Sequence, residues 1–383
     1  MTRLLLAPDK FKGSLTAAEV VAALARGIAE TAPDAEILSC PIADGGDGTV
    51  DAALAAGAIA QPARITGPTG EVRETVWALE DTTAVLELAD AVGLKALPSE
   101  DLAPRTASSR GLGELILAAV SAGAREIVVG LGGSASTDAG AGLLQALGAC
   151  LLDADGDDIA PGLAGLETLA SADLAPALAA LDGARLIAAN DVGNPLLGAD
   201  GAAAVYGPQK GLDPQAVASA DRTLAAAAAL LDPSGEAARA EGAGAAGGVG
   251  YSLLLLGAAQ RSGADVVLEL ADFDARLASA DLVVTGEGKL DAQTLQGKGP
   301  AEVARRAAAA GLPVLAVAGA VTLTDEELGG AGITAAPDLV SRAADVADAI
   351  ARGQELLAGI GREIGRSLPS LLGDAQGAAA PLP

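Results

Sequence analysis

Clusters that combine glycine with Asp, Lys or Ser recur along the chain and hold the residues best suited to chemistry. They span residues 9–14, 44–49, 130–142, 190–195, 207–211, 242–250 and 285–298. Glycine lets backbone N–H groups approach an anion, and Lys and carboxylate side chains bind phosphates and divalent metals. This mixture of groups suits phosphoryl transfer, in which a protein mainly positions its substrates and neutralises their charge.

The turn DGGDGT carries two carboxylates three residues apart, Asp44 and Asp47, among three glycines. Such a flexible acidic turn suits a hydrated magnesium ion or the hydroxyl groups of a polyol. The alternative is that the turn only caps a helix that starts near Thr49. A single acid or Thr49 would be enough for a cap, which leaves the second acid for chemistry.

The segment TGEGKLDAQTLQGK places two acids and two cations in one loop: Glu287, Lys289, Asp291 and Lys298. Acids and cations together are natural for a site that binds a metal and a phosphate. Ordinary surface ion pairs are the alternative interpretation.

Two lysines, Lys10 and Lys12, stand in DKFKGS. On a strand they would point to opposite faces, so both can serve one ligand only if the segment is a loop, which Gly13 and Ser14 favour. In a chain with 24 Lys and Arg against 50 Asp and Glu, two lysines at the entrance of a helix indicate a clamp for a carboxylate or phosphate.

The loops 130–142 and 242–250 each run into a stretch with helical period, where backbone N–H groups and the helix dipole attract anions. Neither is a Walker A loop, because no Gly-Lys-Ser/Thr follows at the required spacing. A dinucleotide-binding fingerprint requires an apolar strand before its glycines, and none precedes residues 242–250. Tight turns and close helix packing are the alternative interpretation of these glycines.

The composition excludes several classes of function. A net charge of −26 without a basic stripe argues against nucleic acid and anionic membranes as partners. Histidine is absent, which removes Ser-His-Asp and Cys-His pairs and His-bearing metal sites, so a general base must be Asp, Glu, Lys, Tyr or Cys. Two cysteines, which we expect to be buried, and the lack of a signal-like or membrane-spanning apolar run predict a cytoplasmic protein.

Short apolar runs that alternate with Ala- and Leu-rich helical stretches predict an α/β fold with a mainly parallel sheet. The runs are residues 4–7, 126–131, 185–189, 281–285 and 313–319. Nearly every glycine cluster follows such a run, at the sheet edge where α/β proteins bind ligands. After residues 4–7, Thr16 and Glu19 have the spacing of a capping box and predict the start of a helix.

The length of 383 residues predicts two domains with a ligand cleft between them. Around Trp77, residues 65–88 alternate in a way typical of antiparallel strands, which indicates entry into a second domain. We therefore expect a discontinuous parallel domain, residues 1–64 plus 281–383, with an inserted α/β domain, residues 65–280. A simple two-block chain is the alternative.

With these loops in view, the sequence resembles the bacterial glycerate kinase family (glycerate 2-kinase, type 1). The matching stretches run in the family's order from Leu6 to about Gly319: APDKFKGSLTA, PIADGGDGT, GPTG, GELI, GLGGSASTDAGAGLLQALG, DVGNPL, GPQKG and TGEGKLDAQTLQGK. The chain departs from the family pattern at Arg110, Thr137, Gly193 and Gln296. Where this chain has Gln296, the family often has a His. The histidine is therefore dispensable for the reaction in this chain, or the activity is altered.

The resemblance implies that the protein uses magnesium-ATP to phosphorylate D-glycerate. It implies transfer to the 2-hydroxyl, which gives 2-phosphoglycerate. It implies two unlike α/β domains, a parallel flavodoxin- or Rossmann-like sheet domain with a second, mixed-sheet domain inserted, and an active site in the cleft between them. It implies small-molecule substrates, no nucleic acid and no membrane, and it is compatible with a homodimer.

Site roles follow from the same resemblance. Asp191 would orient or deprotonate the acceptor hydroxyl, and Lys10 and Lys12 would hold the carboxylate or the transferring phosphate. The magnesium candidates are Asp44, Asp47, Glu287 and Asp291. The nucleotide-binding candidates are Gly132, Gly133, Ser134, Asp138, Lys210, Lys289 and Lys298.

Two other classes of function compete with this interpretation. A kinase of another small hydroxy acid or polyol would use the same loops. A non-catalytic, two-domain carboxylate-binding protein would need one anion clamp only, whereas several Lys and Asp loops recur here. A dehydrogenase lacks both the fingerprint and a His for proton transfer.

Overall fold

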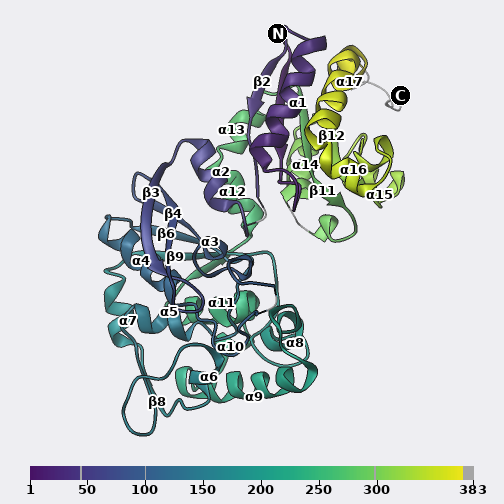
Figure 1. Ribbon diagram of the computed structural model, residues 1–383. Helices are drawn as coiled ribbons and strands as arrows, with labels where there is room; N and C mark the ends of the chain where they lie inside the picture. Colours follow the sequence, from purple (N-terminus) through teal and green to yellow (C-terminus); the bar gives the residue numbers. More distant parts are fainter. Residues whose placement is uncertain (44, 100, 297–298, 374–383) are drawn as a thin grey trace. The chain divides into compact units, whose positions relative to one another are not determined.

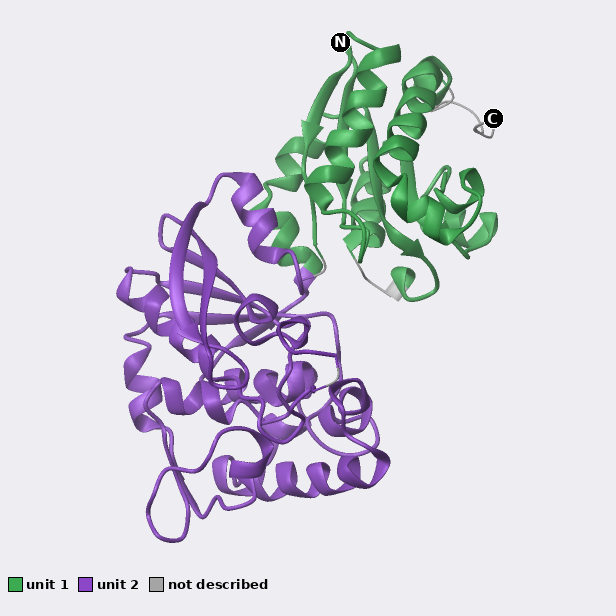
Figure 2. Cartoon of the chain, viewed as in Figure 1, with its two compact units in different colours: residues 1–44, 264–383 green, residues 45–263 purple. Residues whose placement is uncertain are grey.

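A computed structural model describes residues 1–43, 45–99, 101–296 and 299–373. The chain divides into two compact units (Figures 1 and 2). Unit 1 consists of Met1–Asp44 and Ala264–Pro383, and unit 2 consists of Gly45–Gly263. Each unit has its own sheet and its own hydrophobic core.

The sheet of unit 1 is parallel, with strand order β12-β11-β1-β2. Its strands are β1 (Arg3–Pro8), β2 (Glu36–Ser39), β11 (Leu282–Leu290) and β12 (Val314–Val321). Leu4 of β1 pairs with Leu282 of β11. The two ends of the chain therefore meet in one sheet, as the sequence predicts for residues 4–7 and 281–285.

Helices α1 and α17 pack closely in unit 1 (Figure 1). A Cβ on Gly27 of α1 would lie 2.0 Å from the Ala358 carbonyl oxygen, and one on Gly361 of α17 would lie 2.4 Å from that of Leu24. The predicted capping box of Thr16 and Glu19 starts α1. The helices are α1 (Ala17–Thr31), α12 (Gly263–Leu270), α13 (Phe273–Leu277), α14 (Gly299–Ala309), α15 (Asp325–Gly330), α16 (Val346–Ala351) and α17 (Gly353–Gly373), with 3₁₀ turns η3 (Thr294–Gln296) and η4 (Val340–Arg342).

The sheet of unit 2 is mixed, with strand order β10-β9-β6-β5-β4-β3. The strands β3 (Ile59–Thr66), β4 (Val72–Glu80) and β5 (Thr83–Glu87) are antiparallel, as the alternation around Trp77 predicts. From β5 the sheet continues in parallel through β6 (Glu126–Gly130), β9 (Arg185–Ala189) and β10 (Ala259–Arg261). Because β5, β6, β9 and β10 are parallel, the loops that follow them lie at the same edge of the sheet.

Short helices and one long one surround the sheet of unit 2. They are α2 (Thr49–Ala56), α3 (Leu88–Val92), α4 (Arg110–Ser121), α5 (Ala141–Ala146), α6 (Gly162–Leu166), α7 (Ala175–Ala180), α8 (Ala202–Tyr206), α9 (Pro214–Leu231), α10 (Glu236–Arg239) and α11 (Ala245–Leu255), with 3₁₀ turns η1 (Leu94–Ala96) and η2 (Pro208–Lys210). A separate two-stranded antiparallel sheet pairs β7 (Cys150–Leu152) with β8 (Ser171–Asp173). Within the described ranges no helix combines the length and apolarity that crossing a bilayer requires.

The chain passes from unit 1 to unit 2 after residue 44 and returns to unit 1 after residue 263. The expected boundary at 64/65 therefore falls inside unit 2, and the expected boundary at 280/281 falls inside unit 1. The reason is packing. Helix α2 contacts β4 and β5, which draws it into unit 2. Arg276 of α13 donates a hydrogen bond to the Ser39 carbonyl at 2.8 Å, which ties that helix to unit 1.

The cysteines differ from each other. Cys40 is buried directly after β2, as expected. Cys150 is exposed and begins β7, so the expectation of a buried residue at a helix end is wrong. Cys150 is the first residue of a three-residue strand in a two-stranded sheet, a position that leaves its side chain accessible. Interpreting the preceding apolar residues as a helix that ends at Cys150 could not anticipate this.

Candidate active site

In unit 2, chemically capable residues follow the ends of parallel strands. Glu87, Gly130 and Ala189 end β5, β6 and β9 in register with one another. Asp191 comes two residues after β9, at the carboxyl end of a buried strand, as the sequence predicts. Because the strands are parallel, the loops after them share one edge of the sheet.

Two glycine-rich loops, residues 45–48 and 130–134, touch at this edge. A Cβ on Gly130 would lie 2.9 Å from the Gly45 carbonyl oxygen, and one on Gly132 would lie 2.6 Å from the Gly46 Cα. Both glycines are therefore needed for close approach of the two backbones. The two loops, which are far apart in sequence, form one surface.

Asp47 forms an ion pair with Lys95, which lies in the turn η1. The hydrogen bond to Asp47 raises the pKa of Lys95. Thr49 donates its hydroxyl to the Gly46 carbonyl at 2.8 Å, and the N-cap residue of α2 is Gly48, so the turn does not cap the helix through Asp47 or Thr49. The sequence interpretation missed Lys95, because a lone Lys in LKALPSE carries no motif.

Glu87 is a further acid that sequence reasoning missed. It is 2% exposed, and its Oε2 accepts hydrogen bonds from the backbone N–H groups of Gly48 at 2.9 Å and Val50 at 3.3 Å. Burial, with the nearby charge of Asp90, raises its pKa to about 8. The available signal was an acid that ends an apolar strand run, TAVLE, next to the predicted ligand edge.

Asp138 lies at the centre of the loop 130–142 and is fully buried. Its carboxylate accepts hydrogen bonds from the N–H and Oγ of Ser109 at 2.9 and 2.8 Å, from Ser136 Oγ at 3.0 Å, and from Gly140 N–H at 3.2 Å and Gly142 N–H at 3.3 Å. These bonds fix the shape of the loop before the short helix α5.

Lys210 is 2% exposed and lies where three glycine-rich segments converge. Its Nζ donates to Ser134 Oγ and to the Ser136 carbonyl, both at 2.6 Å. A Cβ on Gly247 would lie 2.8 Å from this Nζ. Burial lowers the pKa of Lys210 to about 7, although Asp138 opposes the shift. Segments 130–142, 207–211 and 242–250, separate clusters in the sequence, are thus joined by one amine.

The predicted phosphate loop exposes its backbone at Gly133, which has φ +66°, while Ser134 is buried under Lys210. Gly133 accepts a hydrogen bond from Leu94 N–H at 2.8 Å. The helix that follows starts only at Ala141, so the loop does not open directly into a helix as expected. Asp138 and its neighbours occupy the interval.

Asp191 is exposed, and its Oδ1 accepts a hydrogen bond from Gly263 N–H at 2.9 Å. Nearby, Asn194 accepts a hydrogen bond from the Tyr206 hydroxyl at 2.6 Å. The loop is a turn without helical structure, as its Asn-Pro sequence predicts.

In unit 1, the predicted cations and acids lie just after β1 and at or just after the carboxyl end of the neighbouring strand β11. Lys10 is partly buried and Lys12 is exposed in a turn closed by pairing of Phe11 with Leu15. A Cβ on Gly288 of β11 would lie 3.2 Å from the Lys12 backbone nitrogen, so the two segments lie side by side.

The acids on β11 have partners within their own loop. Glu287 Oε1 accepts a hydrogen bond from Thr294 Oγ1 at 2.6 Å, and Lys289 forms an ion pair with Asp291 at 3.1 Å. The local ion pair proposed as an alternative is therefore present. Asp44 and Lys298 lie outside the described residues.

Among the residues that are described, no three Asp, Glu or Cys side chains gather as a potential metal site. Asp47 belongs to unit 2, and Glu287 and Asp291 belong to unit 1. Magnesium commonly uses one or two carboxylates together with water and substrate phosphates, and these carboxylates have suitable chemistry for it.

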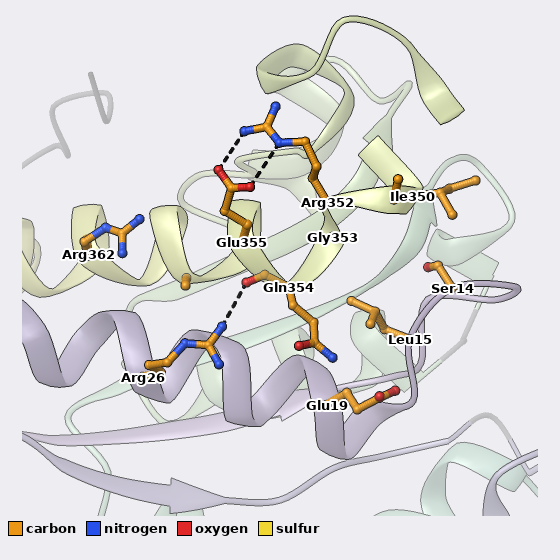
Figure 3. A pocket seen from close by; sticks show the side chains of 12 residues that line it. Ser14, Leu15, Glu19, Arg26, Ile350, Arg352, Gly353, Gln354, Glu355 and Arg362 are labelled. Carbon is orange, nitrogen blue, oxygen red and sulfur yellow. Dashed lines mark hydrogen bonds and ion pairs between the residues drawn. The ribbon is translucent and has the colours of Figure 1, made fainter. Parts of the chain in front are cut away.

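A hollow of about 670 Å³ in unit 1 lies between α1 and the start of α17 (Figure 3). Arg26 donates to the Gln354 carbonyl at 3.3 Å, and Arg352 pairs with Glu355 at 2.8 Å. None of the predicted site residues that the structure describes lines this hollow. Its only link to them is Ser14, at the end of the predicted lysine clamp.

Comparison with known proteins extends the same pattern over the whole chain. The model of the glycerate kinase family matches residues 4–369. A glycerate kinase of Bacillus subtilis is 40% identical over 96% of this chain and 97% of its own. A glycerate 2-kinase of Escherichia coli is 41% identical over 84% of this chain and 86% of its own.

The fold agrees as well. A crystal structure from Salmonella typhimurium LT2, described as glycerate kinase 2, superposes with a TM-score of 0.83 at 38% identity and covers 96% of this chain and 98% of its own. The resemblance that the glycine and lysine motifs indicated is therefore confirmed, and so is the α/β architecture with one parallel and one mixed sheet. The chain belongs to the glycerate kinase family of enzymes.

Proposed function

We propose that this enzyme transfers the γ-phosphoryl group of ATP to the 2-hydroxyl of D-glycerate in a magnesium-dependent reaction. The observation that carries the proposal is similarity along nearly the whole chain to relatives named glycerate kinase. The relative named glycerate 2-kinase supports the position of transfer. The converging loops of unit 2 supply what such a reaction needs, backbone N–H groups and acids at one sheet edge.

The acceptor side of the reaction belongs to Asp191 and two lysines. Asp191 is exposed just after β9, and its Oδ1 accepts a hydrogen bond from Gly263 N–H, which holds the carboxylate where it would orient a substrate hydroxyl. As the hydroxyl oxygen bonds to the γ-phosphorus, the bond to the ADP oxygen breaks and the hydroxyl proton passes to Asp191. Lys10 and Lys12 provide positive charge for the glycerate carboxylate or the moving phosphate.

The nucleotide side belongs to the loop 130–142. The backbone of the half-buried Gly132 and of the exposed Gly133 approaches the phosphates, and Ser134, Asp138 and Lys210 hold the loop in shape. Lys289 and Lys298 are further candidates for phosphate contacts. Asp44, Asp47, Glu287 and Asp291 are the candidates to hold Mg²⁺, which when bound would neutralise charge on the phosphates.

An ADP-release assay over a panel of small hydroxy acids and polyols tests the acceptor. We expect kcat/KM for D-glycerate to exceed that for every other compound in the panel. A higher value for another hydroxy acid would identify a kinase with a different substrate. Binding of glycerate without ADP release from any acceptor would indicate a carboxylate-binding protein.

A further inference from the structure

Helix α2 begins without a side-chain cap from its own N-cap residue. That residue is Gly48, whose φ of +103° lies in the left-handed region. Ser, Thr or Asp, which commonly cap helices, are strained in that conformation. The N–H groups of the first turn therefore need an acceptor from elsewhere in the fold.

Glu87 supplies this acceptor from the sheet. Its Oε2 accepts from both Gly48 N–H, at 2.9 Å, and Val50 N–H, at 3.3 Å. Gly48 is the immediate neighbour of Asp47, so the carboxylate anchors the loop that carries the magnesium candidate. Asp47 is relieved of capping and pairs with Lys95 instead.

The anchor is costly for a purely local cap. Glu87 Oε1 is buried and has no hydrogen-bond partner within the described part of the chain, and Asp47 and Asp90 lie near enough to repel its charge. A buried carboxyl oxygen without a hydrogen-bond partner destabilises the folded state, even when the group is neutral, as its raised pKa favours. This position of the loop is therefore held at the expense of stability, a combination typical of functional sites.

Glu87 also fixes the two glycine-rich loops relative to each other. It pairs in register with Gly130, the last residue of β6, while its side chain holds Gly48. The loop 45–48 in turn packs against Gly130 and Gly132 at distances that leave no room for a Cβ. One residue thus links the backbone of both loops to the sheet.

We propose that Glu87 is a positioning residue for phosphoryl transfer, which holds Asp47 and the loop 45–48 in place beside the loop 130–134 without touching the substrates. This inference rests on the proposed function. A misplacement of about 1 Å of a positioning group commonly lowers turnover about 100-fold.

The experiment compares Glu87→Ala and Glu87→Gln with a matched pair at Glu114. Glu114 also accepts from a backbone N–H in unit 2, that of Thr66 at 2.6 Å, but it belongs to α4 and holds β3 instead of a glycine-rich loop. For each variant we would measure Tm, kcat, both KM values, and amide hydrogen exchange of a peptide that covers residues 45–52.

We expect Glu87→Ala to lower kcat by about tenfold or more and to speed exchange in the 45–52 peptide. Glu87→Gln should recover kcat to within about threefold, because an amide oxygen can still accept both N–H bonds. Glu114→Ala should keep both kcat and the exchange of that peptide, because Glu114 holds β3 and not a glycine-rich loop. Turnover in Glu87→Ala within about twofold of wild type would overturn the proposal.

The role of Glu87 can still be tested if Glu87→Ala fails to fold or if the enzyme acts on a different substrate. If Glu87→Ala does not fold, Glu87→Asp replaces it: the shorter carboxylate cannot reach both N–H groups, so a folded variant with reduced kcat supports the proposal and one with normal kcat overturns it. If the wild type acts on another hydroxy acid, the glycerate assignment fails. The same comparison with that acceptor then still decides the role of Glu87.

Discussion

Individual residues at the candidate site divide into exposed groups that can meet a substrate and buried groups that shape the loops. Asp191, Lys12 and Gly133 are exposed, whereas Asp138 and Lys210 are buried and bonded to the loop 130–142. Sequence patterns identified all five without separating the two kinds. Glycine-rich loops have no periodicity, so burial of a polar side chain within them cannot be predicted.

Asp191→Asn tests the acceptor side. Because Asn can still accept the bond from Gly263 N–H through its amide oxygen, the fold should be kept. We expect kcat to fall by roughly 10²- to 10⁴-fold, the usual scale for general acid–base groups, with the KM for ATP nearly unchanged. Tm and kcat are measured on one preparation; a variant with normal kcat would remove Asp191 from the mechanism.

Lys210 should make stability depend on pH. Its pKa is lowered from 10.5 to about 7 in the folded chain, so between these values the unfolded chain holds more protons. The free energy of unfolding contributed by this residue therefore rises with pH across that window. We would measure the free energy of unfolding in urea for wild type and Lys210→Met at about pH 7 and about pH 9. The value for wild type minus the value for the variant should be larger at the higher pH. An equal difference at both pH values would mean that the amine titrates normally.

At the scale of elements, the strands and the capping box of α1 follow from local sequence, because apolar runs and cap spacing are local signals. The limits of the units do not follow in the same way. Helix α2 belongs to unit 2 because it packs on β4 and β5, and no pattern within residues 45–64 shows which sheet it will cover. For the same reason, Glu87 and Lys95 escaped prediction, since their partners are distant in sequence.

Contact between the two glycine-rich loops makes a prediction at this scale. Gly132→Ala would place a Cβ 2.6 Å from the Gly46 Cα, so one backbone must move. We expect a loss of about 1–3 kcal/mol of stability together with lower kcat. Gly329→Ala in α15, where an added Cβ meets nothing within 4 Å, is the control and should lower neither quantity. Equal behaviour of the two variants would show that the loops can separate freely.

The whole molecule is strongly acidic, with a net charge of −26, while its proposed substrates are anions. Carboxylates near ATP would repel its phosphates unless a cation intervenes. We therefore expect exhaustive treatment with EDTA to abolish turnover and added Mg²⁺ to restore it. Full activity after chelation would contradict a magnesium-dependent reaction.

The discontinuous chain path could be predicted because the first and last strands carry the same buried, parallel pattern. The location of the active site between the two domains stays a prediction. Substrate identity rests on similarity along the chain, because the loops indicate phosphoryl transfer more directly than they indicate its acceptor.

Product analysis tests the central claim most directly. The enzyme is incubated with D-glycerate, ATP and Mg²⁺, and the products are followed by phosphorus NMR. The account predicts 2-phosphoglycerate and ADP in equal amounts. Formation of 3-phosphoglycerate would contradict the proposed position of transfer, and a folded enzyme that forms no phosphoglycerate at all would contradict the proposed function itself.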